Sequence, residues 1–304
     1  MTTGTESEPR RARAGTGDDW TVLRLILWSA EYLKGKGVAS GRLDAEHLLA
    51  YVVGVGRLQL YLEYDRPLTP GELDGFRPLL KRRAKREPLQ YIVGRQPFRE
   101  LDLVVTPAVL IPRPETEVLV DEILSWAEEQ GREDLKAIDV GTGSGAIALS
   151  LAIEGPFASV VATDIDEDAL EVARRNRDAA QLAETVELRL GSLLDPVEAN
   201  ERFDVVTSNP PYVAESDADG LEPEVREWEP RDALFGGPDG LDVLTKLTGG
   251  AHSVLRQGGL LALEVGAGQA ERVTTMLEGV GSYEDVTVKR DYTGRERIVL
   301  ASCA

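Results

Sequence analysis

The sequence predicts an α/β fold in which a mostly parallel sheet, covered by helices on both faces, follows a small helical bundle. From Leu135 onward, short apolar runs alternate with helical patterns, as in parallel strands that are joined by helices. The last two apolar runs are separated only by the polar run from Lys289 to Arg295, which predicts an antiparallel hairpin at the end of the sheet. Before residue 88, apolar residues recur at helical spacing instead.

The region from 105 to 304 is expected to form one domain around this sheet. Its strands are predicted over 135–140, 159–163, 185–190, 203–208, 259–264, 284–289 and 296–301. Its helices are predicted over 145–153, 167–180, 239–256 and 269–279. Ahead of the first strand, a proline-rich loop leads to a predicted helix over 116–129, because Pro114 and the acidic residues after it suit a helix N-terminus.

Residues 20–87 are expected to form the helical domain. Apolar spacing predicts helices from Val22 to Leu33, from Leu43 to Val53 and from Leu58 to Glu63. A fourth helix is predicted after Thr69, which is a suitable N-cap with a proline at the first helical position.

Residues 88–104 have a different pattern. Tyr91 to Val93 are aromatic or β-branched, Gly94 follows them, and Phe98, Leu101, Leu103 and Val104 are apolar. This pattern predicts a β-hairpin that links the helical domain to the sheet.

Composition limits the classes of function. The chain has 304 residues and a net charge of −19, and so acidic a surface repels the nucleic-acid backbone unless a basic patch intervenes. Cys303 is the only cysteine, and His47 and His252 are the only histidines, so we expect neither a disulfide nor a bound metal. No apolar run reaches the length of about 18 residues that a membrane span needs. We expect residues 1–19 to be a disordered tail and the protein to be a cytoplasmic monomer.

A glycine-rich segment follows the first predicted strand of the sheet. It comprises Gly141, Thr142, Gly143, Ser144 and Gly145, which together are called the glycine loop below. Glycines at the carboxyl end of such a strand let the backbone turn sharply and approach a ligand closely. The next predicted strand ends at Asp164, whose carboxylate is well placed to accept hydrogen bonds from both hydroxyls of a ribose. The two features together indicate a bound nucleoside.

The glycine spacing bears on which nucleoside binds. Sites for NAD typically carry G-x-G-x-x-G, whereas the glycine loop reads G-x-G-x-G. Asp139 precedes the loop, and a carboxylate there suits the positive charges of S-adenosylmethionine better than a pyrophosphate. We therefore favour S-adenosylmethionine over NAD.

The acceptor is indicated by Asn209, Pro210, Pro211 and Tyr212, called the acceptor segment below, which directly follows the strand predicted over 203–208. Residues before proline are biased to extended conformations, so the side-chain oxygen of Asn209 and the carbonyl of Pro210 are able to face one pocket. Two fixed acceptors suit an NH₂ group, and Tyr212 offers an aromatic face to a planar group. The segment therefore predicts methylation of an amide or an exocyclic amine, achieved by positioning the two reactants.

Other segments match a known family. They are Glu87 to Ile92 with Gly94, Ile111 to Glu117, Glu229 to Arg231 with Ala233 and Leu234, and Gly237 to Gly240. With these segments, the glycine loop and the acceptor segment, the chain from about Trp20 to its end resembles the HemK/PrmC family, the release factor glutamine methyltransferases. The resemblance implies a seven-stranded, Rossmann-like class I methyltransferase fold with S-adenosylmethionine as donor. It also implies N5-methylation of the glutamine in the Gly-Gly-Gln loop of peptide chain release factors.

The resemblance also implies roles for single residues. The glycine loop would hold the methionine end of the cofactor and Asp164 its ribose, while Asn209 would contact both the cofactor and the glutamine. The rest of the acceptor segment would hold the glutamine, with Asn209, Pro210 and Tyr212 as its catalytic residues. The family often has a Gly-Asp-x-Phe-like stretch near the adenine. Here that stretch reads Gly191-Ser192-Leu193-Leu194, which leaves Leu193 as an apolar neighbour of the adenine.

Other functions remain open at this point. An adenine-N6 DNA methyltransferase also acts on an exocyclic NH₂ group, but it needs a basic groove or a target-recognition domain. A glutamine of a ribosomal protein is an alternative acceptor that the sequence separates poorly from a release factor. A scaffold that binds the nucleoside without catalysis is disfavoured by the intact acceptor segment. Outside these motifs, Arg113 either steers the substrate loop or pairs with a carboxylate. Glu264 ends a strand at the carboxyl edge, where a place at the rim of the pocket is one alternative, but we favour a surface carboxylate. Trp228 lies in a loop, 222–230, that is expected to cover the acceptor site.

Overall fold

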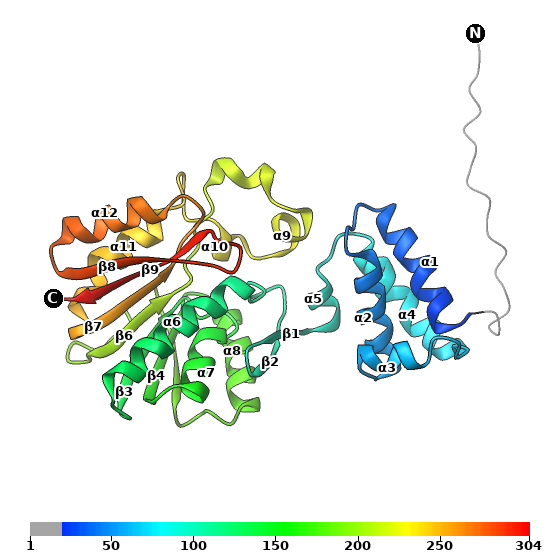
Figure 1. Cartoon of the computed structure of the whole chain (residues 1–304), viewed down its shortest axis with the longest axis horizontal. Helices are drawn as coiled ribbons and strands as arrows, with labels where there is room; N and C mark the ends of the chain where they lie inside the picture. Colours follow the sequence, from blue (N-terminus) through cyan, green and yellow to red (C-terminus); the bar gives the residue numbers. More distant parts are fainter. Residues whose placement is uncertain (1–19) are drawn as a thin grey trace, which may run out of the picture. The chain divides into compact units, whose positions relative to one another are not determined.

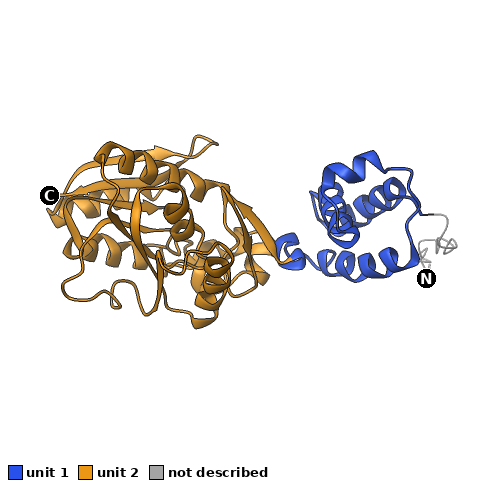
Figure 2. Cartoon of the chain, turned by 90° about the horizontal axis from the view of Figure 1, so that it is seen from below, with its two compact units in different colours: residues 1–93 blue, residues 94–304 orange. Residues whose placement is uncertain are grey.

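The computed structural model describes residues 20–304, and the contacts divide the chain into two compact units (Figure 2). One unit extends to Val93, and the other runs from Gly94 to Ala304. Residues 1–19, expected to be a disordered tail, lie outside the described residues. Each unit is described by itself below.

The first unit is helical, as predicted. Its helices are α1 (Val22–Lys34), α2 (Gly41–Val53), α3 (Arg57–Leu62), α4 (Pro70–Arg83) and α5 (Leu89–Val93). The predicted start of α4 is confirmed, because the Thr69 hydroxyl accepts a hydrogen bond from the backbone N–H of Glu72 while the Glu72 carboxylate accepts one from that of Thr69. Aliphatic and aromatic side chains from α1, α2 and α4 form the core of this unit.

The predicted strand over Tyr91 to Val93 is wrong. These residues belong to the short helix α5, in which Leu89, Ile92 and Val93 pack on the helical core at positions i, i+3 and i+4. The hairpin itself exists but is shorter. It consists of β1 (Arg95–Phe98) and β2 (Leu101–Val104), which pair in antiparallel orientation.

The second unit contains a seven-stranded sheet (Figure 1). Its strands are β3 (Leu135–Val140), β4 (Phe157–Asp164), β5 (Val186–Leu190), β6 (Phe203–Ser208), β7 (Leu255–Glu264), β8 (Tyr283–Arg290) and β9 (Glu296–Cys303). The order across the sheet is β5-β4-β3-β6-β7-β9-β8. β9 pairs with both β7 and β8 in antiparallel orientation, and the other neighbouring strands pair in parallel. Every predicted strand of the sheet and the antiparallel hairpin are therefore confirmed.

Helices cover both faces of this sheet (Figure 1). They are α6 (Pro114–Gln130), α7 (Ala146–Glu154), α8 (Glu167–Ala179), α11 (Asp242–Gly250) and α12 (Ala270–Val280). Apolar residues of α6 and α7 pack on one face, and those of α11 and α12 pack on the other. Because alternate residues of a strand point to opposite faces, Ala137 joins the first cluster and Ile138 the second.

Two stretches differ from prediction. The helix predicted over 239–256 ends at Gly250, a short 3-10 turn η3 (Ala251–Ser253) follows, and β7 then begins at Leu255. Paired glycines at 249 and 250 are poor helix formers, which explains the early end. Residues 222–230, expected to be a loop, contain the helix α9 (Pro223–Trp228). The 3-10 turn η2 (Glu215–Gly220) precedes this helix and the helix α10 (Arg231–Leu234) follows it.

The parallel strands bring polar residues together at one edge of the sheet. β3 lies between β4 and β6, so successive crossovers leave it in opposite directions, and the carboxyl end of β3 is the switch point where ligands bind in such sheets. Asp164 ends β4, Ser208 ends β6 and Glu264 ends β7 at this same edge. The sheet therefore places the residues after four strands around one site.

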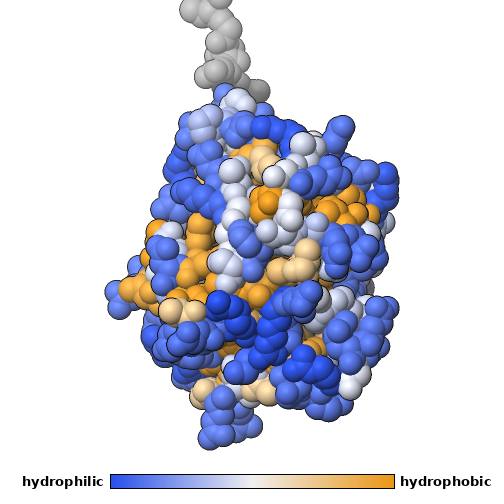
Figure 3. All heavy atoms as spheres, turned by 90° about the vertical axis from the view of Figure 1, so that its left-hand side faces the viewer, coloured by the Kyte–Doolittle hydropathy of each residue, from blue (hydrophilic) through white to orange (hydrophobic). Residues whose placement is uncertain are grey.

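Two further features concern the surface and the helices. On the face drawn in Figure 3, hydrophilic residues surround separate hydrophobic areas. Within residues 20–304, no helix combines the length and the apolar character that crossing a membrane would require.

Candidate active site

The glycine loop turns the chain from β3 into α7. The backbone N–H groups of Gly141 and Thr142 both donate to the carbonyl of Thr163, each at 2.9 Å, and so bind the start of the loop to β4. Gly141 and Gly143 have φ values of +74° and +55°, which residues other than glycine rarely adopt. A Cβ atom at either position would meet no atom within 4 Å. The loop therefore leaves open space beside its backbone, as the approach of a ligand requires.

Asp139 lies beneath this loop and is completely buried. Its Oδ2 accepts hydrogen bonds from the Thr142 hydroxyl at 2.6 Å and from the Ala148 N–H at 3.3 Å. Its Oδ1 is buried and has no hydrogen-bond partner among the described residues. Burial raises the pKa of Asp139 to about 7, and the charge of Asp164 adds to the rise. An unpaired buried carboxylate oxygen suits a positively charged group bound above the loop.

Asp164 is held in place by backbone donors. Its Oδ2 accepts from the Gly143 N–H at 2.8 Å and its Oδ1 from the Asp166 N–H at 3.0 Å. Burial raises its pKa despite these hydrogen bonds. Each carboxylate oxygen can accept a further hydrogen bond, so Asp164 remains able to bind two hydroxyls of a ribose.

The segment after β5 carries Leu193, which has the unusual φ of +51°. The Thr163 hydroxyl donates to the Leu193 carbonyl at 3.2 Å and brings this residue to the end of β4. A bulky residue held at positive φ marks a conformation that its surroundings impose, and such positions gather at functional sites. This geometry agrees with a place for Leu193 at the cofactor site.

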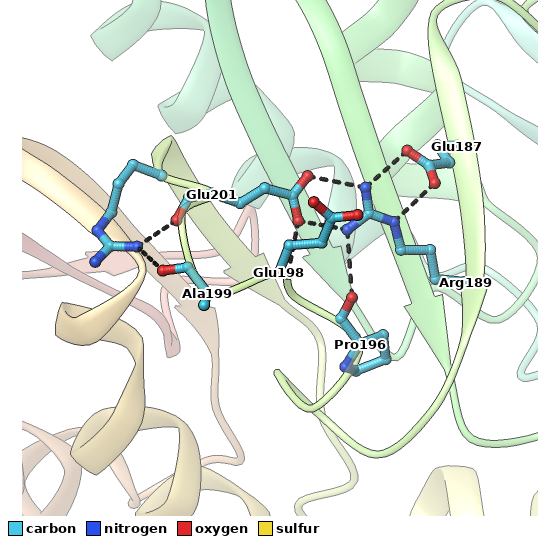
Figure 4. A network of polar contacts seen from close by, with 7 residues as sticks. Glu187, Arg189, Pro196, Glu198, Ala199 and Glu201 are labelled. Carbon is cyan, nitrogen blue, oxygen red and sulfur yellow. Dashed lines mark hydrogen bonds and ion pairs between the residues drawn. The ribbon is translucent and has the colours of Figure 1, made fainter.

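One arginine fixes the rest of that segment, as Figure 4 shows. Arg189 pairs with Glu187 on its own strand and with Glu201, and it also donates to the carbonyl of Pro196 at 3.3 Å. Glu201 in turn accepts from the Glu198 N–H at 2.9 Å. These carboxylates raise the pKa of Arg189 and keep it charged. The network closes the segment between Gly191 and Glu201 onto β5.

The acceptor segment is oriented by a hydrogen bond from another element. The Nδ2 of Asn209 donates to the hydroxyl of Thr116, the third residue of α6, at 3.0 Å. The amide oxygen of Asn209 is therefore turned away from Thr116 and is available to another donor. Ser208 donates to the Val140 carbonyl at 2.6 Å and ties the start of the segment to β3.

Glu264 connects the remaining parts of this arrangement. Its Oε2 accepts from the Thr116 hydroxyl at 2.7 Å, and its Oε1 accepts from the Tyr212 hydroxyl at 3.3 Å. Glu264 is 1% exposed, so the expectation of a surface carboxylate is wrong. Glu264 ends its strand at the same edge of the sheet as Asp164, and this position is the signal in the sequence that indicates a site residue. Thr116, inside the proline-rich motif, was also missed as a site residue.

The backbone of the acceptor segment is clamped from below. The side-chain amide of Gln269 donates to the Tyr212 carbonyl at 2.9 Å, while its oxygen accepts from the Gly266 N–H at 2.8 Å. Gly240 packs so closely that a Cβ atom there would lie 2.2 Å from the Tyr212 carbonyl oxygen. The acceptor segment is therefore a rigid structure rather than a free loop.

Arg113 pairs with a carboxylate, which is one of the two roles expected for it. It forms an ion pair with Glu229, which also accepts from the Ile111 N–H at 3.3 Å. Trp228 ends helix α9, and its buried Nε1 has no hydrogen-bond partner among the described residues. Whether this helix covers a bound acceptor stays a prediction.

The β1–β2 hairpin also reaches the glycine loop. The Asn176 side chain in α8 donates to the carbonyls of Ser144 and Val104, at 2.8 and 3.0 Å, and accepts from the Val104 N–H at 2.7 Å. No signal in the sequence identified Asn176 as a site residue. Within the described residues, no group of three or more His, Cys, Asp or Glu side chains is arranged to hold a metal ion.

Two known families match parts of the chain. The PrmC N-terminal domain matches residues 24–94, and the methyltransferase small domain matches residues 115–222. Two solved structures share the fold at 18% sequence identity. The hMettl16 catalytic domain in complex with MAT2A 3'UTR hairpin 6 has a TM-score of 0.54 and covers 74% of this chain and 81% of its own. The T. thermophilus 16S rRNA methyltransferase RsmC has a TM-score of 0.51 and covers 69% of this chain and 50% of its own.

Relatives of established name are much more similar. The release factor glutamine methyltransferase of Geobacter sulfurreducens is 45% identical over 280 residues, which are 92% of this chain and 96% of that protein. The protein of the same name from Moorella thermoacetica is 45% identical over 281 residues, which are 92% of this chain and 98% of that protein. Rossmann-like class I methyltransferase architecture, both matched domains and near full-length similarity all agree, and the chain belongs to the family of release factor glutamine methyltransferases.

Proposed function

We propose that this protein transfers a methyl group from S-adenosylmethionine to the side-chain amide nitrogen, N5, of the glutamine in the Gly-Gly-Gln loop of peptide chain release factors. One observation carries the proposal: Asn209 gives its NH₂ group to Thr116 and keeps its amide oxygen free beside the switch point of the sheet. An amide oxygen in that place is an acceptor for the NH₂ group of an incoming glutamine.

The donor cofactor fits the residues at this edge. S-adenosylmethionine supplies an activated methyl group on a positively charged sulfur. We assign its methionine end to the glycine loop above the unpaired oxygen of Asp139, its ribose to Asp164 and its adenine to the neighbourhood of Leu193. Asn209 lies between the two parts of the site and contacts the cofactor as well in this proposal.

The acceptor segment provides position rather than strong acid–base chemistry. The lone pair of an amide nitrogen is delocalised, so the nitrogen is a poor nucleophile. We propose that Asn209 Oδ1 and the Pro210 carbonyl accept the two amide hydrogens and hold the nitrogen toward the methyl group, while Pro211 and Tyr212 bound the plane of the amide. Holding two reactants in this way accounts for a large part of the rate of such reactions.

Two other acceptors deserve comparison. Adenine N6 presents the same NH₂ chemistry, but the net charge of −19 opposes the binding of a duplex. A ribosomal-protein glutamine fits the acceptor segment as well as a release-factor glutamine does, and the naming of the near full-length relatives favours the release factor. We further propose that the protein acts as a monomer in the cytoplasm, where release factors occur.

The direct test is transfer of labelled methyl from S-adenosylmethionine to parallel acceptors. These are a purified release factor, the same factor with its loop glutamine replaced, ribosomal proteins and duplex DNA. We expect label on the intact release factor alone. Label on DNA alone would establish the adenine methyltransferase instead, and label on ribosomal proteins alone would establish the other glutamine acceptor.

An Asn209→Ala variant tests the site. Loss of a positioned hydrogen-bond partner in an active site costs on the order of 100-fold or more in rate. We expect at least that loss of transfer with only a small change in affinity for S-adenosylmethionine, measured by calorimetry, because most contacts to the cofactor are assigned to the glycine loop and Asp164. Full activity of the variant would remove Asn209 from its assigned role.

A further inference from the structure

Three elements form one buried line of hydrogen bonds at the acceptor site. Asn209 follows β6, Thr116 lies in the first turn of α6, and Glu264 ends β7. The Asn209 Nδ2 lies 3.0 Å from the Thr116 Oγ1, which lies 2.7 Å from the Glu264 Oε2. Thr116 and Glu264 are 4% and 1% exposed, so solvent water does not compete for the hydrogen bond between them.

The number of available protons decides which group donates and which accepts in each of these hydrogen bonds. An ionised Glu264 has no proton and accepts only. Thr116 has one hydroxyl proton, which it donates to Glu264, so toward Asn209 it can act only as an acceptor. Asn209 must then present its NH₂ group to Thr116 and its oxygen to the other side.

A protonated Glu264 removes that constraint. Its own proton can then be donated to Thr116, whose hydroxyl proton becomes free to point at Asn209. The amide of Asn209 can rotate by half a turn and accept that proton with its oxygen. Its NH₂ group would then face the acceptor pocket, where it meets the NH₂ group of a glutamine donor to donor.

We propose that Glu264 is a positioning residue whose ionised form, acting through Thr116, keeps the Asn209 amide oxygen turned toward the substrate amide. Glu264 does not touch the reacting atoms. It also accepts from the Tyr212 hydroxyl, so one carboxylate orients both side chains of the acceptor segment that carry polar atoms. This inference rests on the proposed function, because it assigns a role within that reaction.

The surroundings of Glu264 place its titration in the working range of pH. Burial raises the pKa of Glu264 to about 7, and the charge of Glu115 in α6 acts in the same direction. Arg297 in β9 and the hydroxyls of Thr116 and Tyr212 oppose the rise. Arg113 and Arg297 lower the pKa of Tyr212, but burial and the charge of Glu264 keep it well above the usual range, so Tyr212 remains a donor.

The expected sign follows directly. The active arrangement needs the ionised carboxylate. The rate of transfer is therefore highest above the pKa of Glu264 and falls as the pH drops through about 7. Asp139 also has a pKa raised to about 7. Because Asp139 lies under the glycine loop, its titration is expected to change cofactor affinity, and saturating S-adenosylmethionine removes that contribution from the measured rate.

The test measures kcat and KM for the release factor between pH 5.5 and 8.5 at saturating cofactor in the full-length protein. These pH limits span roughly 1.5 units on either side of neutrality. In Glu264→Gln the group no longer titrates, so we expect kcat to fall by about 10-fold at pH 8 and the decline below neutrality to disappear. Cofactor affinity, measured separately, is expected to stay unchanged.

Two substitutions of Thr116 form a matched pair of test and control variants. Thr116→Val keeps the shape and loses the hydroxyl, so it should lose about 10-fold or more in kcat and also lose the decline. Thr116→Ser keeps the hydroxyl and should recover most of the rate together with the decline. This pair decides the question if Glu264→Gln does not fold, which thermal unfolding would reveal.

The outcomes separate this inference from the proposed function. Absence of transfer to any release factor by the unchanged protein would overturn both. Transfer whose pH profile is the same in the unchanged protein and in Glu264→Gln or Thr116→Val would overturn the positioning role alone. Equal rates of Thr116→Val and Thr116→Ser would do the same.

Discussion

Arg113 and Glu229, 116 residues apart in the chain, form an ion pair that joins the proline-rich loop before α6 to the segment after α9. The Glu229 side chain is 1% exposed and that of Arg113 is 31% exposed. Burial raises the pKa of Glu229, and the charge and hydrogen bond of Arg113 oppose that rise. The buried carboxylate therefore depends on Arg113 for its only cation among the described residues.

Removing Arg113 alone should therefore lower the free energy of unfolding more than removing both partners of the ion pair. In Arg113→Ala the Glu229 carboxylate stays buried without its partner, and we expect a loss of about 1–3 kcal/mol in the free energy of unfolding. The double variant Arg113→Ala with Glu229→Gln should recover part of this loss, because no unpaired charge remains. Urea unfolding of Arg113→Ala, of Glu229→Gln, of the double variant and of the unchanged protein gives the coupling. Additive losses would show that the pair does not act as a unit.

Asp164→Ala should weaken the binding of S-adenosylmethionine and leave the acceptor segment intact. Hydrogen bonds to a charged group contribute about 1.5–3 kcal/mol each, so we expect the Kd for the cofactor to rise by at least 10-fold. Calorimetric titration of the cofactor measures this. Rates at saturating cofactor should recover toward those of the unchanged protein. An unaltered Kd would contradict the assignment of Asp164 to the ribose.

Asp139 links stability to pH. Its pKa in the folded protein is raised to about 7, so the folded state holds this proton more tightly than the unfolded state does. The resulting stability is fully present below the ordinary pKa of an aspartate and is lost as the pH rises through about 7. Asp139→Asn does not titrate, so its Tm relative to the unchanged protein should rise from pH 5 to pH 8, a range of about 3 units around the transition. A constant difference in Tm over this range would show that Asp139 does not titrate there.

The same variant is informative about the cofactor. If the charge of Asp139 attracts the positive groups of S-adenosylmethionine, Asp139→Asn should bind it more weakly at pH 8 even where the apoprotein is more stable. If Asp139→Asn raises stability and weakens cofactor binding, the buried charge of Asp139 serves binding and lowers the stability of the fold.

Local patterns predicted most of the fold. Strands β3 and β6 are buried along their length except for Lys136 and were predicted at their observed bounds, because short runs rich in apolar residues that end at glycine or proline turns favour buried strands. The failures occurred where a local pattern allowed two outcomes. Residues 91–93 suit a strand by composition, but packing of Ile92 on the helical core gives a helix. Short helices such as α9, with no buried residues of its own, leave no periodic signal.

The parts of the site that follow neighbouring strands of the sheet were predictable from the sequence. Asp164 and the glycine loop follow neighbouring strands, so their contact through Gly143 follows from topology. The Thr116–Glu264 contact joins residues 148 positions apart in sequence, on a helix and on a strand. Nothing in the sequence between them records that contact. It depends on how α6 packs on the sheet, which only the tertiary structure provides.

Gly240 offers a last test, because it shows how strictly the acceptor segment is clamped. Its φ is +75°, and an added Cβ atom would lie 2.2 Å from the carbonyl oxygen of Tyr212, which is backbone and cannot move aside. Gly281, at the end of α12, has a similar φ of +72°, but an added Cβ atom there would meet nothing within 4 Å. The two glycines thus share a strained backbone conformation and differ in whether they touch the acceptor segment.

Alanine at either position should therefore destabilise the protein by roughly 1–2 kcal/mol through the backbone conformation alone. Only Gly240→Ala should displace Tyr212 and, with it, the groups that hold the amide. A displacement on the order of 1 Å at an active site costs about 100-fold in rate. We expect a loss of that order for Gly240→Ala and nearly full transfer for Gly281→Ala, measured well below the Tm of both. Equal activity of the two folded variants would mean that the acceptor segment tolerates movement, and rigid positioning of the amide would then not be the source of the rate.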